Sequence, residues 1–321
     1  MSREREMEVG AALGEVREVS MGQGSVRYRD VGRGEPILFV HGVLVNCELW
    51  GDVVVRLSGR FRCVVPDLPL GEHSVALGPE AEVSPRGVAK IVADFMKALD
   101  LRDVTLVGND TGGAVCQIVI ANHPERIGRL VLTNCDAYEA FFPLLLRPFH
   151  YGARFLGTRF TDLLAWSLRA RTMRGVLLAT VARRRVDDAV LDAYFAPLIN
   201  DPGVRRDLTR FLARATNCHT LEAARSFPGF RRPVLIVWGE DDIFFLGRYA
   251  RRLERDFPDA TLEFLPGSRT FVLEDRPERL AELIETVLRT RARRYPVIGG
   301  GWIATDAATE ARIRAAHERD T

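Results

Sequence analysis

The 321-residue chain has the composition of an ordinary globular protein, with 47% hydrophobic and 27% charged residues, which excludes general disorder. Its net charge of +2 gives no electrostatic argument for a nucleic-acid partner. The five cysteines are odd in number and include no CxxC pair, so neither a disulfide framework nor a metal site is predicted, and no cofactor is expected.

The chain contains no segment that predicts a membrane anchor or a secretion signal. The charged start MSREREMEVG is not followed by an apolar run of signal-peptide length, and no stretch reaches about 18 uncharged apolar residues. We therefore expect a cytoplasmic protein with no membrane partner. A homodimer is left open.

Strands and helices alternate through the first part of the chain. The strands expected first are EVREVS, SVRYRDV, PILFV and RCVVPDL, starting at residues 15, 25, 36 and 62. A helix is expected over 84–99, then the strand VTLVG from 104, a helix from Thr111 and the strand RLVLTNC from 129. This alternation implies a parallel sheet.

The alternation stops between about 136 and 228, where amphipathic segments follow one another without a strand. It resumes with the strand PVLIVWG, a helix over 247–257, the strand TLEFL and a last helix for which Asp275 is the expected N-cap. We therefore predict the following division: an N-terminal segment 1–14, a sheet core 15–135 and 229–295, a helical cap 136–228, and a tail 296–321.

A sharp strand-turn-helix element is predicted around Asp110. The run Gly108-Asn109-Asp110-Thr111-Gly112 follows an apolar strand and precedes a helix, and its glycines permit a strained turn that exposes the central residue. The simpler interpretation is that Asp110 only caps the following helix.

These residues resemble the nucleophile elbow of the α/β-hydrolase superfamily, within the branch that carries aspartate there, the epoxide hydrolases and dehalogenases. The resemblance covers roughly residues 15 to 290. It implies a mostly parallel eight-stranded sheet with helices on both faces and a helical cap insertion. It also implies that Asp110 attacks a saturated carbon and forms an alkyl-enzyme ester, which water then cleaves.

Two further motifs fit that resemblance. His41-Gly42-Val43 resembles the segment that builds the oxyanion hole, so the backbone N–H groups of Val43 and Thr111 are the expected donors. The run PVLIVWGEDD resembles the strand and loop that deliver the acid of the triad, which would be Asp242. Leu44 replaces the usual proline, and Val43 and Thr111 stand where many dehalogenases carry halide-binding Asn and Trp.

The chain departs from the family at Thr270, which stands where the resemblance places the catalytic histidine. No histidine occurs between His219 and His317. A hydroxyl group cannot accept a proton near neutral pH as imidazole does, so the base that activates water is missing from its usual place. A two-step hydrolase built in this way should stall after the alkylation step.

Three hypotheses follow from the missing histidine. A base could come from His41 or His73, ranked ahead of His150 and His219 in the cap. Asp110 could act as a general acid or base without a covalent step, for an isomerisation, elimination or cyclisation. The chain could also bind a ligand without catalysis.

Several cap residues are candidates for contact with a substrate. An epoxide needs a proton donor, for which Tyr151 and Tyr194 are available, and Trp166 is a further candidate, although each also suits ordinary packing. Thr270 is expected to contact the substrate from the core side. An apolar lining, and hence a hydrophobic small-molecule substrate, is expected from Phe141, Phe142, Leu144, Phe149 and Phe155. The preferred function is epoxide ring-opening, ahead of dehalogenation.

Overall fold

The computed structural model describes residues 13–184 and 188–294. The predicted tail at 296–321 and almost all of the predicted segment 1–14 lie outside these residues. The chain divides into one compact unit up to Glu285 and a second from Thr286, and the site described below lies in the first.

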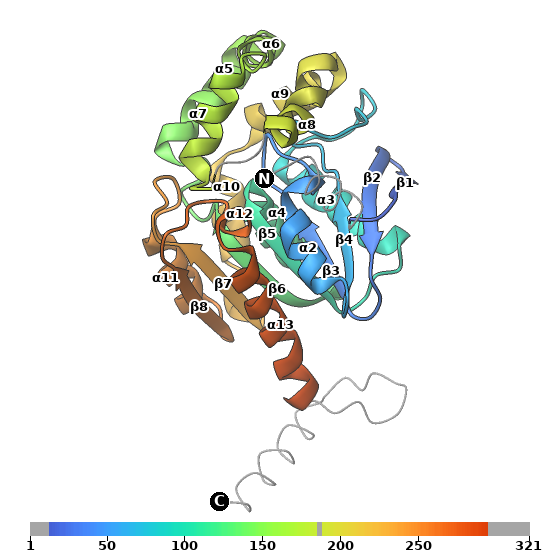
Figure 1. The fold of residues 1–321 in the computed structure, drawn as a ribbon, viewed down its shortest axis with the longest axis vertical. Coiled ribbons are helices and arrows are strands. Elements are labelled where there is room, and N and C mark those ends of the chain that lie inside the picture. The colour runs from blue at the N-terminus through green and yellow to red at the C-terminus, as the bar shows by residue number, and fades with distance from the viewer. Residues whose placement is uncertain (1–12, 185–187, 295–321) are drawn as a thin grey trace, which may run out of the picture. The chain divides into compact units, whose positions relative to one another are not determined.

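Eight strands form one sheet, in the order β1-β2-β4-β3-β5-β6-β7-β8 (Figure 1). Their bounds are Val16–Met21, Gly24–Val31, Pro36–Val40, Arg62–Pro66, Val104–Asp110, Ile127–Cys135, Val234–Gly239 and Ala260–Leu265, for β1 to β8. The pairs β1/β2 and β2/β4 are antiparallel, and the other neighbours are parallel. The predicted mostly parallel eight-stranded sheet is therefore confirmed.

Helices cover both faces of this sheet, as predicted (Figure 1). The core helices are α2, Gly51–Leu57; α3, Pro85–Ala98; α4, Thr111–Asn122; α11, Gly247–Asp256; α12, Val272–Asp275; and α13, Pro277–Arg294. On one face α2 joins the start of α13 through ion pairs from Arg56 to Glu278 and from Arg60 to Glu285. On the opposite face α3 packs against α4. Because both faces are covered, every residue of β5 and β6 is buried.

The segment between β6 and β7 contributes helices and no sheet strand within its described residues. These helices are α5, Arg147–Leu156; α6, Thr158–Ser167; α7, Arg171–Val181; α8, Asp188–Asn200; α9, Pro202–Arg214; and α10, Asn217–Ala224. Short 3₁₀ turns occur at Cys47–Trp50 (η1), Pro124–Arg126 (η2), Leu144–Leu146 (η3) and Phe227–Gly229 (η4). The domain boundaries given above remain a prediction.

The predicted N-cap of the last helix was wrong. Asp275 ends α12, and the first helical bond of α13 runs from the Leu280 N–H to the carbonyl of Arg276. The Asp275 carboxylate instead accepts hydrogen bonds from the backbone N–H groups of Arg183, Arg184 and Arg269. It therefore ties the end of α7 to the loop that carries Thr270.

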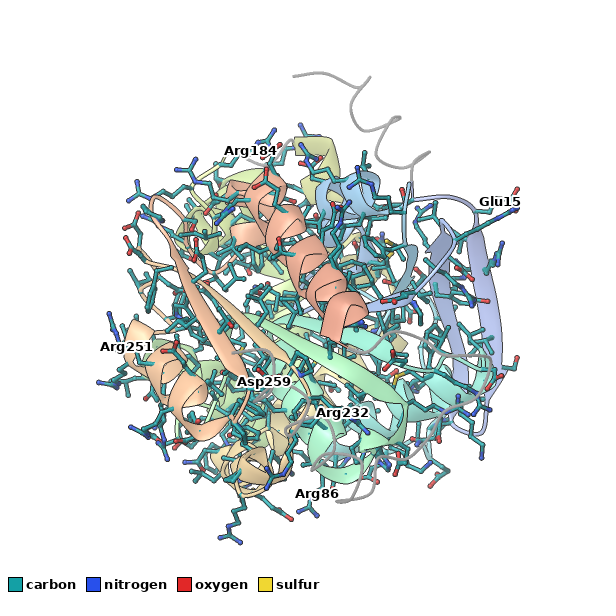
Figure 2. All side chains as sticks on the ribbon, turned by 90° about the horizontal axis from the view of Figure 1, so that it is seen from below. Glu15, Arg86, Arg184, Arg232, Arg251 and Asp259 are labelled. Carbon is teal, nitrogen blue, oxygen red and sulfur yellow. The ribbon has the colours of Figure 1, made fainter. Side chains whose placement is uncertain are left out.

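Charged side chains of both signs surround the core in the view from below, among them the labelled Glu15, Arg86 and Arg251 (Figure 2). Four cysteines are buried and Cys218 is exposed, and all five are free thiols. Among the helices that the structure describes, none combines the length and the apolar character needed to cross a bilayer.

Candidate active site

The turn from β5 into α4 has the strained geometry that the sequence predicts. Asp110 has φ 54° and ψ −131°, a region that residues other than glycine rarely adopt. A Cβ on Gly112 would overlap the carbonyl oxygen of Val40, and a Cβ on Gly113 would lie 2.7 Å from the sulfur of Cys135. The glycines therefore let α4 approach β3 and β6 closely, which holds the turn in place.

The Asp110 carboxyl is buried and receives hydrogen bonds from the backbone N–H groups of Val43 and Thr111. These are the two groups predicted to form an oxyanion hole, and the structure brings both to Asp110. The two donors belong to different segments, the loop after β3 and the first turn of α4, so the position of the carboxyl depends on both.

Burial, with a smaller contribution from the charge of Asp242, raises the pKa of Asp110 to about 7, although the two N–H donors act in the opposite direction. Near neutral pH the carboxyl is consequently divided between its protonated and ionised forms. A group poised in this way is suited to proton transfer as well as to nucleophilic attack.

Asp110→Asn should stabilise the folded protein, most strongly at high pH. An acid whose folded pKa exceeds its unfolded value destabilises the fold once it ionises, so the penalty is absent below the unfolded value of 3.8 and complete above about 7. At about 1.4 kcal/mol per pKa unit, the penalty amounts to about 4 kcal/mol. Urea unfolding of both proteins at about pH 5 and about pH 8 checks this, and an equal difference at both pH values would contradict it.

Asp242 and Thr270 lie together in the structure. The Thr270 hydroxyl donates a hydrogen bond of 2.9 Å to Asp242, which also accepts 2.7 Å from the amide of Asn134. The backbone N–H groups of Phe244 and Phe245 complete its shell. All four donors are neutral, and burial raises the pKa of Asp242. Threonine therefore occupies the place of the expected histidine without supplying a positive charge.

Sequence reasoning missed two asparagines that connect the loops of the site. Asn109 donates to the Thr270 carbonyl at 2.8 Å and to the Thr133 hydroxyl at 2.7 Å. Asn134 also accepts from the Gly239 N–H at 2.6 Å. Both lie at the carboxyl ends of apolar strands, β5 and β6, which end at the same edge of the sheet. That position was the signal in the sequence that could have identified them.

A third buried carboxyl of the site, Asp136, was also missed. It accepts a hydrogen bond from the Thr111 hydroxyl at 3.1 Å, and its other oxygen has no partner among the described residues. Burial, followed by the charge of Asp110, raises the pKa of Asp136 well above its usual value. The described residues contain no group of three or more acidic, His or Cys side chains able to hold a metal ion.

The hypothesis that His41 supplies the missing base is contradicted by its hydrogen bonds. Its Nε2 accepts from the Leu68 N–H at 2.9 Å, which requires the proton on Nδ1, and Nδ1 donates to the Gly42 carbonyl at 2.8 Å. Both ring nitrogens are thereby occupied by backbone, and burial lowers the pKa of the ring. His41 instead fixes the loop after β3.

The other histidines also lie elsewhere. His73 pairs with Asp207 of α9 at 3.3 Å and does not line the cavity described below. In the helical segment between β6 and β7, His150 is bound to the carbonyl of Leu212 and His219 to that of Arg214. Among the described residues, no histidine faces Asp110 across the cavity, so the displaced-base hypothesis was wrong for each candidate named.

An apolar cavity of about 680 Å³, a volume that includes space open to solvent, lies against Asp110. Asp110 is its single polar lining residue. The remaining lining comes from loops of the sheet and from the helical segment: Val43, Leu44, Val45, Phe244, Phe245, Phe271, Phe142, Leu146, Phe149, Leu177, Leu178, Val181, Phe195 and Leu212. Such a space favours a hydrophobic molecule with one reactive group near the carboxyl.

Several residues that were predicted to contact the substrate do not line the cavity. Tyr151 and Trp166 are 50% and 66% exposed on the surface, and Leu144 and Phe155 are more exposed still, because they occupy the outer sides of their helices. Tyr194 is buried, but its hydroxyl has no partner within the described residues and does not line the cavity. Phe141 and Thr270 are buried, but they are not among the residues that line the cavity.

Gly42→Ala should disturb the site more than the fold. An added Cβ would lie 2.7 Å from the carboxyl carbon of Asp110, so the carboxyl must leave its two N–H donors. We expect a stability loss of about 1 to 3 kcal/mol and a changed Asp110 titration. Gly59→Ala, where a Cβ meets nothing within 4 Å, is the control. Denaturation gives the unfolding curves of the two variants, and NMR gives the pKa of Asp110 in each. If both quantities were the same in the two variants, the prediction would be refuted.

Comparison with known proteins gives one family match. A family model described as alpha/beta hydrolase fold matches residues 35–277. Haloalkane dehalogenase 2 of Mycobacterium tuberculosis is 28% identical over 270 residues, which cover 82% of this chain and 91% of that protein. The cis-3-alkyl-4-alkyloxetan-2-one decarboxylase of Xanthomonas campestris is 28% identical over 294 residues, with coverage of 82% and 92%.

Solved structures have the same fold at lower identity. A haloalkane dehalogenase from Bradyrhizobium elkani has a TM-score of 0.71 at 17% identity, covering 86% of this chain and 99% of that one. An alpha/beta hydrolase fold protein from Burkholderia ambifaria has a TM-score of 0.72 at 22% identity, with coverage of 84% and 96%.

Proposed function

The chain belongs to the α/β-hydrolase family, and from that premise we propose that it opens hydrophobic epoxides with Asp110 as the nucleophile. The observation that carries this proposal is the cavity in which the Asp110 carboxyl is the single polar lining group. A substrate held there by apolar contacts has one group to react with, at the end of β5.

The alkylation step forms one bond and breaks one bond. A carboxylate oxygen of Asp110 attacks a ring carbon, the ring C–O bond breaks, and the ring oxygen takes a proton from water, which leaves a hydroxyalkyl ester on Asp110. Apart from Asp110, whose ionised carboxylate is the nucleophile, none of the described lining residues can donate a hydrogen bond from its side chain. An alkyl halide is therefore a poorer substrate, because the departing halide remains an anion that this cavity does not solvate.

The second step, ester hydrolysis, is expected to be slow. Water must lose a proton as it attacks the ester, and Thr270, which donates its own proton to Asp242, cannot accept one near neutral pH. The histidines that the structure describes do not face the cavity. The ester on Asp110 should consequently persist.

A second candidate function avoids the missing base altogether. One relative is named as a decarboxylase of cis-3-alkyl-4-alkyloxetan-2-ones, and that reaction consumes no water. Asp110 would attack C4, the alkyl-bearing ring carbon that is bonded to the ring oxygen. The bond between C4 and the ring oxygen would break, which frees a carboxylate. Loss of CO₂ would then form the alkene and break the bond to Asp110, which regenerates the enzyme. The observation that favours this candidate is the absence of a base among the described lining residues, together with room for alkyl chains.

Intact-protein mass spectrometry tests both candidates. Incubation with long-chain terminal epoxides should add one epoxide mass, and peptide mapping should place it on Asp110. Incubation with a cis-3,4-dialkyl-oxetan-2-one should release alkene and CO₂ without a lasting adduct if the second candidate is right. Epoxide product without an adduct would favour an acid or base role for Asp110, and no reaction with any probe would favour a binding role.

A further inference from the structure

The helical segment over the cavity carries a dense group of exposed apolar side chains on η3, α5, α6 and α7. We name this group the outer cap surface and define it by Leu144, Leu145, Tyr151, Phe155, Leu156, Leu163, Trp166, Met173 and Val176. In Figure 1 these helices stand together at the top of the view, away from the sheet. Exposed large apolar side chains that gather on neighbouring elements commonly mark an interaction site.

These side chains point outward because the opposite sides of their helices are already used. Both α5 and α6 pack against α9, through sides that bury Ala153, Thr161 and Ala165. The rings of Tyr151 and Phe155, one helical turn apart on α5, stack with 6.2 Å between their centroids, yet Phe155 remains 75% exposed. These apolar side chains are therefore exposed although the helices that carry them are folded and packed against α9.

The charge around the outer cap surface is mostly positive. Residues 144–181 contain six arginines, no lysine and one acidic residue, Asp162, which pairs with Arg205 of α9. Two of the arginines pair with Asp192. The other four are exposed, and their side chains have no ion-pair partner within the described residues: Arg147, Arg154, Arg159 and Arg169.

We propose that the outer cap surface docks on an anionic lipid bilayer. Aromatic and aliphatic side chains beside unpaired arginines are the pattern of helices that lie in a membrane interface. Anionic headgroups complement the four arginines, whereas a second copy of this chain would place its own arginines against them. The sequence predicted no membrane partner, because it has no apolar stretch long enough to span a bilayer. A docking surface leaves no such signal, since helical periodicity does not tell which side of a cap helix is buried.

Docking in this position would bring the cavity next to the lipid. Leu146 of η3 and Leu177 and Val181 of α7 line the cavity, and they belong to the elements that carry the outer cap surface. A hydrophobic substrate could then pass from the bilayer to the cavity without crossing water. The proposal does not depend on the chemistry of Asp110, so Asp110→Asn should bind vesicles as the wild type does.

Vesicle flotation tests the proposal directly. The full chain should float with vesicles of equimolar phosphatidylcholine and phosphatidylglycerol and remain unbound with phosphatidylcholine alone. Binding should fall as salt rises, because ions screen the attraction between arginines and headgroups. Failure to float with the anionic vesicles at low salt would overturn the proposal.

Matched variants locate the contact. Arg154→Gln with Arg159→Gln should weaken binding about 25-fold, since each arginine near an anionic surface contributes about fivefold. Arg33→Gln with Arg231→Gln, two exposed arginines of the core, is the control and should change little. Likewise Phe155→Gln should weaken binding, and Val55→Gln on α2 should not. Equal losses in both members of a pair would overturn the assignment, and thermal unfolding checks that each variant folds.

Tryptophan fluorescence provides an independent measurement. Trp50 and Trp238 are fully buried, so in a Trp302→Phe background the response to lipid comes from Trp166. Its emission should shift to shorter wavelength with anionic vesicles, and the shift should vanish in Trp166→Phe. If light scattering instead finds a dimer that Phe155→Gln dissociates, and vesicles produce no shift, the outer cap surface binds a second copy and the lipid proposal is wrong.

Discussion

Thr270→His is expected to speed hydrolysis of an ester on Asp110 by about 10² to 10⁴-fold, the usual contribution of a positioned base. The Thr270 hydroxyl already lies 2.9 Å from Asp242, and the cavity-lining Phe271 follows it directly. An imidazole there would be oriented by Asp242 and could take a proton from water next to Asp110. Once protonated, the imidazole would also supply a positive charge to Asp110 and Asp242, whose present hydrogen-bond donors are all neutral.

Single-turnover mass spectrometry measures this effect. Protein alkylated by an epoxide is separated from the reagent, and the decay of the adduct is followed with time in wild type and variant. Thr270→Val removes the hydroxyl with little change of volume and is the control, for which no acceleration is expected. The triad interpretation further requires that Asp242→Asn removes most of the gain in the Thr270→His background. An adduct that decays equally fast in all these proteins would contradict it.

Asp110→Asn is expected to abolish alkylation, with a loss of about 10⁴-fold or more, because removal of a nucleophile eliminates the covalent step. The asparagine has nearly the same shape and can still accept hydrogen bonds from the N–H groups of Val43 and Thr111, so the cavity should survive. Rates of adduct formation with one epoxide, measured on both proteins, provide the comparison.

Asp136→Asn is the matched control for this variant. Asp136 is also a buried carboxyl with a raised pKa, but it contacts Thr111 and does not line the cavity. We expect its variant to retain alkylation, since Asp136 neither lines the cavity nor is among the groups that shift the pKa of Asp110. In the wild type the alkylation rate should rise with pH through about 7, because the ionised carboxyl is the nucleophile. Alkylation of Asp110→Asn at the wild-type rate would exclude the proposed role.

The loops of the site were predictable in part because short motifs carry much of their geometry. The strained turn at Asp110 needs glycines at fixed positions beside it, and its place between an apolar strand and a helix is visible in the order of residues. The contact between Asp242 and Thr270 was instead expected from the family resemblance, which places the acid and the histidine of the triad at these two positions. The asparagines that hold these loops together were missed, since Asn109 and Thr270 are 161 positions apart and no local pattern links them.

The sequence by itself determined the sheet core and the position of Asp110, because strand and helix periods and turn residues act over a few neighbouring positions. Only the tertiary structure decided which side chains reach Asp110. His41 was excluded by two backbone hydrogen bonds, and Tyr151 and Trp166 lie on the outside of helices whose inner sides pack on α9. An amphipathic pattern tells that one side of a helix is apolar, but the neighbour that covers it depends on packing between distant segments.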